Sequence, residues 1–262
     1  MIPNDFDVEG LTKSIRALGL PFGLPMSWVA ETGSTNADAV AAANAGAPHG
    51  ALFVADHQTQ GRGRMGRTWI SPPGQNLYAS IVLRPSLEVE RLPCITLAIG
   101  LAVADAVAEL VDSAVVGIKW PNDVLVNQRK VAGILVEGAL SGDRCEFIVI
   151  GLGLNVHQRV FDPSIASRAT SLANEAERIP ARHDLLLSVL QHMSSRLMSF
   201  EHGGLQALMD ELNARDVTKG RNVRVGDACG VADGIEPDGR LRVVLDGKVE
   251  RLHAGDVEIL EG

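Results

Sequence analysis

The chain has 262 residues, a length typical of one large domain or of a large domain with a small one. Hydrophobic residues make up 46% and charged residues 21%, an ordinary balance for a globular protein with a real core. The net charge of −8 argues against a protein that binds nucleic acid through bulk electrostatics, and no apolar stretch is long enough to span a bilayer.

The N-terminal part of the chain predicts two helices with a strand between them. Residues 11–20 have helical spacing, and Pro21 is expected to stop that helix. Residues 27–46 then read as a strand, a turn and a helix. At the start of this helix Thr35 is followed three residues later by Asp38, which resembles a capping box.

The middle of the chain predicts a mixed β-sheet. Two short strands at 51–57 and 77–85 precede a long apolar helix at 93–111. Four further strand candidates follow, separated mainly by tight turns that favour antiparallel or mixed pairing: 115–120, 123–127, 130–140 and 145–156. Helical periodicity returns at 182–213. We therefore expect an α+β domain with a mixed sheet and helices on one side of it.

The C-terminal segment differs in character. Residues 217–262 contain several short strands broken by Gly-Asp and Asp-Gly turns, a pattern typical of a small all-β barrel. A unit of that size is marginally stable alone, so it is expected to pack on the main domain. The sequence thus predicts two domains, 1–216 and 217–262.

Cysteine usage and the N-terminus indicate a cytoplasmic protein. Cys94, Cys145 and Cys229 are odd in number and far apart, so we expect small buried thiols in a reducing compartment and no disulfide framework. The first ten residues, MIPNDFDVEG, are acidic where a secretory signal is basic and then apolar.

The most informative segment is GRGRMGRTW at residues 61–69. Its three glycines let backbone N–H groups approach an anion, and its three arginines add permanently charged donors for phosphate or carboxylate. On an acidic chain, such a loop indicates a small anionic ligand rather than a long polyanion. The segment is neither a P-loop nor a dinucleotide-binding fingerprint, because no GK[ST] follows and no helix opens after it.

This loop closely resembles the glycine–arginine loop of the biotin protein ligases. Four further segments occur in that family's order: ETGSTN at 31–36, KWPND at 119–123, RKVAGILVEG at 129–138 and GLGLNV at 151–156. With the C-terminal barrel they cover nearly the whole chain. The resemblance implies the biotin–lipoate ligase fold, similar to class II aminoacyl-tRNA synthetases, with an SH3-like barrel at the C-terminus.

The resemblance also implies a biotin site. A buried ureido ring needs matched polar partners, since each unsatisfied group costs about 1–3 kcal/mol. Ser34, Thr35 and Gln58 offer suitable hydroxyl and amide groups, although helix capping alone also explains Ser34 and Thr35. The implied biotin-binding residues are Ser34, Thr35, Asn36, Gln58, Gly61, Arg62, Gly63, Arg64, Lys130, Gly133 and Leu135.

Cationic side chains are expected to hold the two acidic substrates. A lysine at a strand end is ordinarily a solvated residue, but the family lysine that matches Lys130 reaches the biotin carboxylate and the α-phosphate. The resemblance therefore implies catalytic roles for Lys130, Arg64 and Arg67. Asp123 is the most plausible Mg²⁺ ligand, because Mg²⁺ takes one or two carboxylates with phosphate and water; turn formation after Pro121 is the alternative.

The implied ATP-binding residues are Arg64, Met65, Arg67, Trp69, Asn122, Lys130 and Asn155. Trp69 either stacks on adenine or packs beneath its own loop. Asn155 either binds the adenine edge or holds a left-handed turn. Core packing explains Leu135 nearly as well as a pocket role. Met65 stands where relatives frequently carry basic or polar residues, which lowers the charge of the loop.

The implied reaction has two steps. The biotin carboxylate attacks the α-phosphate of MgATP, giving biotinyl-5′-AMP and pyrophosphate, and a lysine of an apo biotin carboxyl carrier protein then attacks the mixed anhydride. Repulsion among the loop arginines further predicts that residues 58–70 pass from disorder to order when ligands bind.

Three other functions are compatible with parts of this sequence. A lipoate or octanoate ligase or transferase shares the fold, but a transferase needs a suitably placed cysteine, and these motifs contain none. A biotin-responsive repressor needs about 60 residues for a helix-turn-helix ahead of the body, where about 25 stand, so no DNA binding is expected. Lys130 and the loop arginines disfavour a non-catalytic relative. The resemblance permits a homodimer through a sheet edge.

Overall fold

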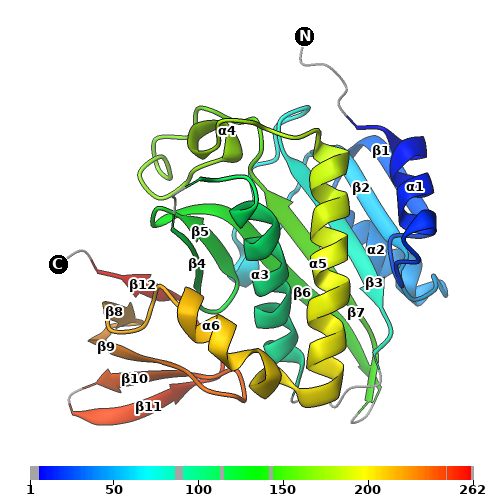
Figure 1. The fold of residues 1–262 in the computed structure, drawn as a ribbon. Coiled ribbons are helices and arrows are strands. Elements are labelled where there is room, and N and C mark those ends of the chain that lie inside the picture. Colours follow the sequence, from blue (N-terminus) through cyan, green and yellow to red (C-terminus); the bar gives the residue numbers. More distant parts are fainter. Residues whose placement is uncertain (1–5, 86–90, 113–114, 142–143, 246, 261–262) are drawn as a thin grey trace.

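The computed structural model describes residues 6–85, 91–112, 115–141, 144–245 and 247–260. Its largest element is a seven-stranded sheet in the order β1-β2-β3-β7-β6-β5-β4 (Figure 1). β1 and β2 pair in parallel and the other neighbours pair antiparallel, so the predicted mixed sheet is confirmed. The strands are β1 (Met26–Thr32), β2 (Leu52–Gln58), β3 (Leu77–Leu83), β4 (Val116–Lys119), β5 (Asp123–Val126), β6 (Arg129–Ser141) and β7 (Arg144–Leu154).

Helices cover both faces of this sheet, so the expectation of helices on one side is wrong. The helices are α1 (Val8–Ala17), α2 (Thr35–Asn44), α3 (Leu92–Ala108), α4 (Leu172–Glu175), α5 (Arg182–Gly203) and α6 (Met209–Arg215). Ile81 and Leu83 of β3 join the large core beneath α3 and α5. The residue between them, Val82, packs instead with Ala39 and Ala43 of α2. Alternate strand residues point to opposite faces, which places α2 across the sheet from α3 and α5.

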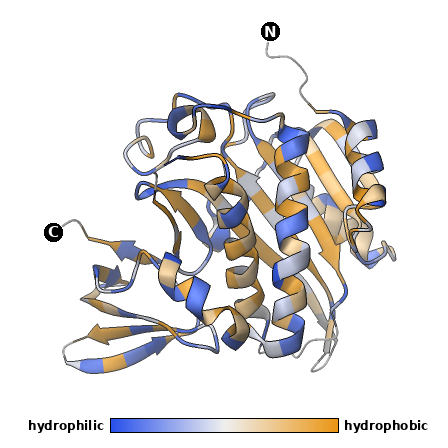
Figure 2. Ribbon diagram, in the orientation of Figure 1, coloured by the Kyte–Doolittle hydropathy of each residue, from blue (hydrophilic) through white to orange (hydrophobic). Residues whose placement is uncertain are grey.

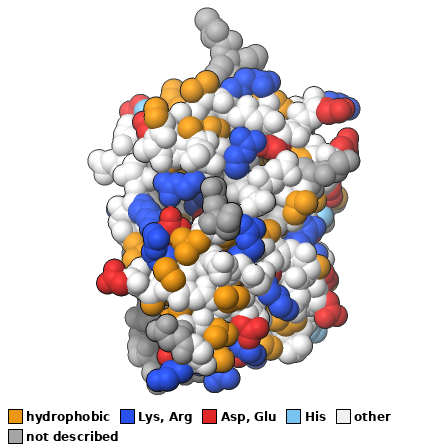
Figure 3. All heavy atoms as spheres, turned by 90° about the vertical axis from the view of Figure 1, so that its left-hand side faces the viewer, with side chains coloured by type: hydrophobic (Ala, Val, Ile, Leu, Met, Phe, Trp, Pro, Cys, Tyr) orange, Lys and Arg blue, Asp and Glu red, His pale blue; other side chains and the backbone are white. Residues whose placement is uncertain are grey.

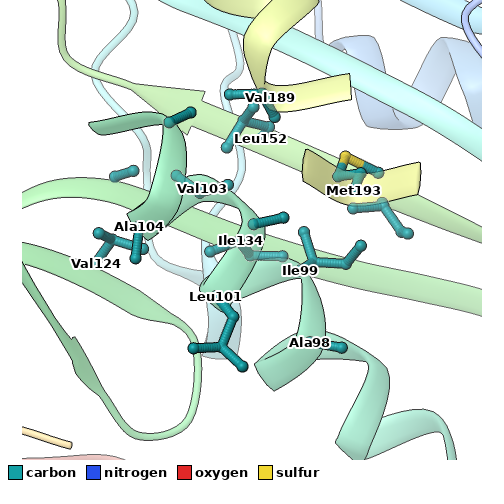
Figure 4. Close-up of a cluster of buried hydrophobic side chains, with 14 of the residues drawn as sticks. Ala98, Ile99, Leu101, Val103, Ala104, Val124, Ile134, Leu152, Val189 and Met193 are labelled. Carbon is teal, nitrogen blue, oxygen red and sulfur yellow. The ribbon is translucent and has the colours of Figure 1, made fainter. Parts of the chain in front are cut away.

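The core beneath α3 and α5 is largely apolar. Ile99 and Val103 of α3 meet Val189 and Met193 of α5 above Ile134 of β6, and each is at most 1% exposed (Figure 4). Burial of such a side chain contributes about 1.5–3 kcal/mol. Figure 2 shows hydrophobic strands behind α5 and both hydrophilic and hydrophobic residues along that helix. The sheet is thereby a rigid support for whatever lies on its other face.

The last part of the chain forms a second, antiparallel sheet in the order β11-β10-β9-β8-β12. Its strands are β8 (Asn222–Val225), β9 (Ala228–Ile235), β10 (Leu241–Leu245), β11 (Lys248–Leu252) and β12 (Val257–Ile259). Trp120 Nε1 of the main body donates to Gly239 O at 2.9 Å, and the Val217 amide donates to Ile118 O at 3.1 Å. Val223 and Leu241 belong to the same core as the main domain, so this unit packs on the body as expected.

Several helix boundaries differ from the sequence prediction, and two of the differences have a clear local cause. α1 begins at Val8 because the side chain of Asp7 accepts a hydrogen bond from the Gly10 amide at 2.9 Å, a cap that the sequence analysis did not recognise. The predicted helix at 182–213 is interrupted after Gly203, because Gly204 has a positive φ of 62°. A short 3₁₀ turn, η3 (Leu205–Leu208), connects the two pieces.

The three cysteines are free thiols, but only Cys94 is buried. Cys145 is half-buried and Cys229, on β9, is exposed, so the expectation of burial is wrong for Cys229. Burial raises the pKa of the Cys94 thiol to about 11. This group is therefore protonated and inert at neutral pH.

The described helices include none with the length and apolar character that a membrane span requires. On the face that Figure 3 turns to the viewer, acidic and basic side chains are interspersed with neutral and apolar ones. That face therefore carries no broad field of one sign.

Candidate functional site

A pocket opens on the α2 side of the main sheet. Its walls come from the start of α2, the end of β2, the glycine–arginine loop, the residue before β5, and the strands β6 and β7. The lining residues are Ser34, Thr35, Asn36, Gln58, Arg62, Gly63, Arg64, Trp69, Asn122, Lys130, Gly133, Ile134, Leu135, Gly151, Leu152 and Gly153. All five sequence motifs therefore meet in one place.

Three strand glycines form the floor of the pocket. Gly133 of β6 pairs in register with Gly153 of β7. A Cβ atom at Gly153 would lie 2.5 Å from Cε2 of Trp69, and one at Gly151 would lie 2.1 Å from Oδ1 of Asn36. These glycines thus let Trp69 and Asn36 lie directly on the sheet. Gly151 and Gly153 were not among the residues predicted from the sequence, although two glycines at strand period on one face were a usable signal.

A hydrogen-bonded polar network forms one end of the pocket. Gln58 Oε1 accepts from both the amide and the hydroxyl of Thr35, at 2.9 and 3.1 Å. Gln58 Nε2 donates to the Ser71 hydroxyl at 2.9 Å. The Ser80 hydroxyl, fully buried on β3, lies 2.8 Å from the Thr35 hydroxyl, within hydrogen-bond distance. The network holds a hydroxyl and an amide in fixed positions at the pocket wall.

The predicted capping box at the start of α2 is wrong. Ser34 is the N-cap residue, and its side chain makes no capping hydrogen bond. Asp38 instead accepts a hydrogen bond from the Thr32 hydroxyl at 2.6 Å. Because Thr35 bonds to Gln58, capping alone does not explain the hydroxyls of Ser34 and Thr35.

Asn36 joins the polar network to the glycine–arginine loop. Its amide donates to Glu137 Oε2 at 2.8 Å, and its carbonyl oxygen accepts from the Ser80 hydroxyl at 2.7 Å. Glu137 also lies 3.9 Å from the guanidinium of Arg62. Ser80 and Glu137 were missed in the sequence; a serine in the otherwise apolar strand LYASIVL was the available signal.

Two of the three cations that line the pocket, Lys130 and Arg64, lie beside Asp123 and Asn122 at what we call the cationic end. Lys130 Nζ lies 2.6 Å from Asp123 Oδ1 and 5.2 Å from the centre of the Trp69 ring. Arg64 donates to Asn122 Oδ1 at 3.2 Å, and burial lowers the pKa of its guanidinium. Asn122 is itself fixed, because its amide donates to Ile134 O at 2.8 Å. The arrangement presents two positive charges beside a largely neutral pocket, which suits an anion.

The glycine–arginine loop is a short hairpin over the pocket. The Gly63 amide donates to Arg67 O at 2.7 Å, and the Trp69 amide donates to Gly61 O at 2.9 Å. Met65 and Gly66 form its tip with positive φ values of 54° and 73°. Met65 is 73% exposed and points away from the pocket lining. Glycine at position 66 therefore serves the turn itself.

Five of the predicted site residues do not line the pocket: Gly61, Met65, Arg67, Asp123 and Asn155. The guanidinium of Arg67 pairs with Asp256 of the C-terminal unit. Asn155 is buried, and its amide donates to Thr170 O at 2.9 Å. The left-handed turn proposed for Asn155 is wrong, since the described non-glycine residues with positive φ are Met65, Asn127 and Gln128.

Trp69 packs beneath its own loop, as one of its two interpretations held. Its ring lies on Gly153 and beside Lys130. The indole Nε1 is buried and has no hydrogen-bond partner among the described residues. A buried unsatisfied donor costs about 1–3 kcal/mol, so this atom is a candidate contact for a ligand.

The described residues contain no cluster of three or more His, Cys, Asp or Glu side chains that could hold a metal ion by themselves. Asp123 pairs with Lys130 at the edge of the pocket, at a distance of 2.6 Å. One carboxylate suits Mg²⁺ that is bound mainly by phosphate and water, and does not suit a structural metal site.

The fold and the pocket define an α+β protein that binds a small ligand between neutral polar groups and a cationic loop. Residues 34–155 match the biotin/lipoate A/B protein ligase family. The biotin–[acetyl-CoA-carboxylase] ligase of Mycobacterium tuberculosis is 39% identical over 87% of this chain and 86% of its own length.

Solved structures agree with this relationship. The biotin protein ligase of Aquifex aeolicus in complex with biotin and ATP superposes with a TM-score of 0.77 and 30% identity, covering 90% of this chain and 99% of its own. The Leishmania major enzyme with biotinyl-5-AMP gives a TM-score of 0.60 at 26% identity, over 87% of this chain and 98% of its own. The chain belongs to the biotin protein ligase family, and its enzyme class is that of the ligases.

Proposed function

We propose that this protein activates biotin with ATP and transfers it to a lysine of a biotin carboxyl carrier protein. The observation that carries the proposal is the composition of one pocket. It holds a neutral hydrogen-bonding network about Gln58 at one end and the cations Lys130 and Arg64 at the other. Biotin has the same polarity, with a neutral ureido ring at one end and a carboxylate at the other.

The neutral end of the pocket is assigned to the ureido ring. Ser34, Thr35 and Gln58 offer both donors and acceptors there, and Asn36 supports them. Gly133 and Leu135 would lie along the apolar body of biotin, with Arg62 and Gly63 of the loop above it, and Gly61 would contribute through the fold of the loop. Burial against such a wall requires that each ureido group finds a partner.

The cationic end is assigned to the reacting groups. Lys130 and Arg64 hold the biotin carboxylate against the α-phosphate of ATP, and they offset the charge that grows on the phosphoryl oxygens. A carboxylate oxygen bonds to phosphorus as the bond from phosphorus to the pyrophosphate oxygen breaks. The products are biotinyl-5′-AMP and pyrophosphate.

The nucleotide is expected beside the loop. Trp69 and Asn122 line this part of the pocket. The buried indole Nε1 of Trp69 has no hydrogen-bond acceptor among the described residues, so a nucleotide atom could accept from it. Met65, Arg67 and Asn155 lie outside the pocket lining, so a direct ATP contact by any of them requires a side-chain movement. Asp123 would hold Mg²⁺ together with the phosphates, and that ion would neutralise phosphate charge.

In the second step the carrier lysine supplies its neutral amine. The amine nitrogen attacks the acyl carbon of biotinyl-5′-AMP, the bond from that carbon to the AMP oxygen breaks, and a proton is released as the amide forms. The protein contributes orientation and exclusion of water here, and no cysteine or serine nucleophile is required.

The finer architecture also belongs to this proposal. We assign residues 1–216 to a catalytic domain similar to class II aminoacyl-tRNA synthetases and residues 217–262 to an SH3-like barrel. A homodimer through a sheet edge, a cytoplasmic location and the absence of DNA binding stay predictions of the sequence. Sedimentation of the purified protein with and without biotin and ATP tests the oligomeric state.

The test of the proposed function is mass measurement of a carrier domain. The full-length protein is incubated with ATP, an apo carrier domain and one of three acids: biotin, lipoate or octanoate. We expect the mass of the carrier to rise by one biotinyl group with biotin and to stay unchanged with the other two. Modification by lipoate or octanoate instead of biotin would support the lipoate ligase alternative.

A further inference from the structure

The glycine–arginine loop contacts the C-terminal sheet across a separation of 189 residues. The guanidinium of Arg67 makes a forked contact with the carboxylate of Asp256: Nη2 meets Oδ2, and Nη1 lies 3.4 Å from Oδ1. Arg64 Nη1 lies 3.5 Å from the carbonyl oxygen of Gly255. Gly255 and Asp256 directly precede β12, so both contacts tie the loop to the second sheet.

Asp256 lies among cations from two separate segments. The hydrogen bond from Arg67 lowers the pKa of the Asp256 carboxyl, and the charges of Arg67, Lys119 and Arg64 act in the same direction. Three cations at this spacing repel one another unless an anion lies between them. Asp256 supplies such an anion from within the protein itself.

The hairpin structure of the loop connects the Arg67–Asp256 contact to the pocket. Arg67 is 63% exposed at its side chain and lies outside the pocket lining. Its carbonyl accepts from the Gly63 amide at 2.7 Å, and Arg62 and Thr68 form a bridge between the two arms of the hairpin. Because Asp256 restrains Arg67, it also restrains Gly63 and Arg64, both of which line the pocket.

We infer that Asp256 is a positioning residue that holds the glycine–arginine loop closed over the pocket through Arg67. The C-terminal sheet thereby controls how firmly the site is covered. The contact itself does not depend on the identity of the ligand, and only its consequence for biotinyl-5′-AMP rests on the proposed function.

The experiment measures tryptic cleavage at the loop arginines in the full-length protein without ligands. Asp256→Asn removes the charge, Asp256→Glu keeps it, and Asp233→Asn is the matched control. The control removes an ion pair of similar exposure, with Arg242, elsewhere in the same sheet. We expect cleavage of the loop to be about two- to fivefold faster in Asp256→Asn, as the loss of one exposed ion pair allows. Asp256→Glu and Asp233→Asn should match the unmodified protein.

A second measurement separates this inference from the proposed function. Release of biotinyl-5′-AMP should also be about two- to fivefold faster in Asp256→Asn, with an unchanged melting temperature. If the unmodified protein forms no adenylate but the loop cleavage still responds to Asp256→Asn, the proposed function fails and the positioning role stands. Equal loop cleavage in Asp256→Asn and the unmodified protein, or equal acceleration in Asp233→Asn, would overturn the positioning role.

Discussion

Lys130 and Asp123 form a 2.6 Å ion pair that joins the two strands of the β5–β6 hairpin. Asn127 and Gln128 make the tight turn of this hairpin with positive φ values of 48° and 66°. The register shifts between Val124 and Leu125, a β-bulge irregularity of the kind that redirects side chains beside active sites. Turn and bulge together bring the carboxylate to the lysine, and the lysine to the pocket.

Replacement of Lys130 tests the cationic end of the pocket. Lys130→Met removes the positive charge that would stabilise the negative charge growing on the phosphoryl oxygens. The rate of adenylate formation should therefore fall by about 100-fold or more. Lys13→Met is the control, because Lys13 is an exposed residue of α1 that pairs with Glu9. Quench measurements of biotinyl-5′-AMP formation check this. A Lys130→Met rate within a factor of about two of the control would remove Lys130 from the proposed role.

Replacement of Gln58 tests the neutral end of the pocket. Gln58→Ala removes both the acceptor used by Thr35 and the donor to Ser71, so the KM for biotin should rise by about tenfold or more. The KM for ATP should stay unchanged. Gln60→Ala, at an exposed neighbouring position, is the matched control. A rise in the KM for ATP instead of biotin would place the nucleotide at this end.

Arg64 is expected to retain the reactive intermediate. Its guanidinium is half-buried beside Asn122, where a charge-assisted hydrogen bond is worth about 1.5–3 kcal/mol. Arg64→Gly should therefore release biotinyl-5′-AMP about tenfold faster or more, measured as free adenylate separated from protein. Arg178→Gly, at an exposed position, serves as the control. Unchanged retention in Arg64→Gly would show that Arg64 does not hold the adenylate.

The glycine floor predicts a contrast in stability. Gly153→Ala places a methyl group 2.5 Å from the Trp69 ring, which should lower the free energy of unfolding by about 1–3 kcal/mol and displace the loop. Gly100→Ala in α3 meets nothing nearer than Ile118 Cδ1 at 3.9 Å, so it should be neutral or stabilising by up to about 1 kcal/mol. Thermal unfolding of both variants measures this difference in the free energy of unfolding. A Gly153→Ala protein that is as stable as the Gly100→Ala protein would contradict the close packing of Trp69.

The local signals in the sequence predicted the elements well and their contacts less well. Strand periodicity and turn residues located the strands of the main sheet, because both signals are local. The sequence did not predict that α2 covers the opposite face, because a helix of mainly small alanines carries little information about its partner. It also missed the Asp7 cap, which lay in a segment that was read only for its charge.

The site residues show the same difference between local signals and long-range contacts. Candidate residues in or close to the motifs, such as Gln58 and Lys130, line one pocket. Residues that act from a distance were not found: Ser80 holds Thr35 from β3, and Asp256 holds Arg67 from the second sheet. Their partners lie 45 and 189 residues away in the chain, and no local pattern records such pairings.

The central claim is that one pocket joins the carboxylate of biotin to the α-phosphate of ATP. Exchange of labelled pyrophosphate into ATP measures that step directly and needs no carrier protein. We expect exchange that requires biotin, is lost in Lys130→Met and is retained in Lys13→Met. Exchange that is absent with both substrates present, or that is equally fast with lipoate in place of biotin, would contradict the account.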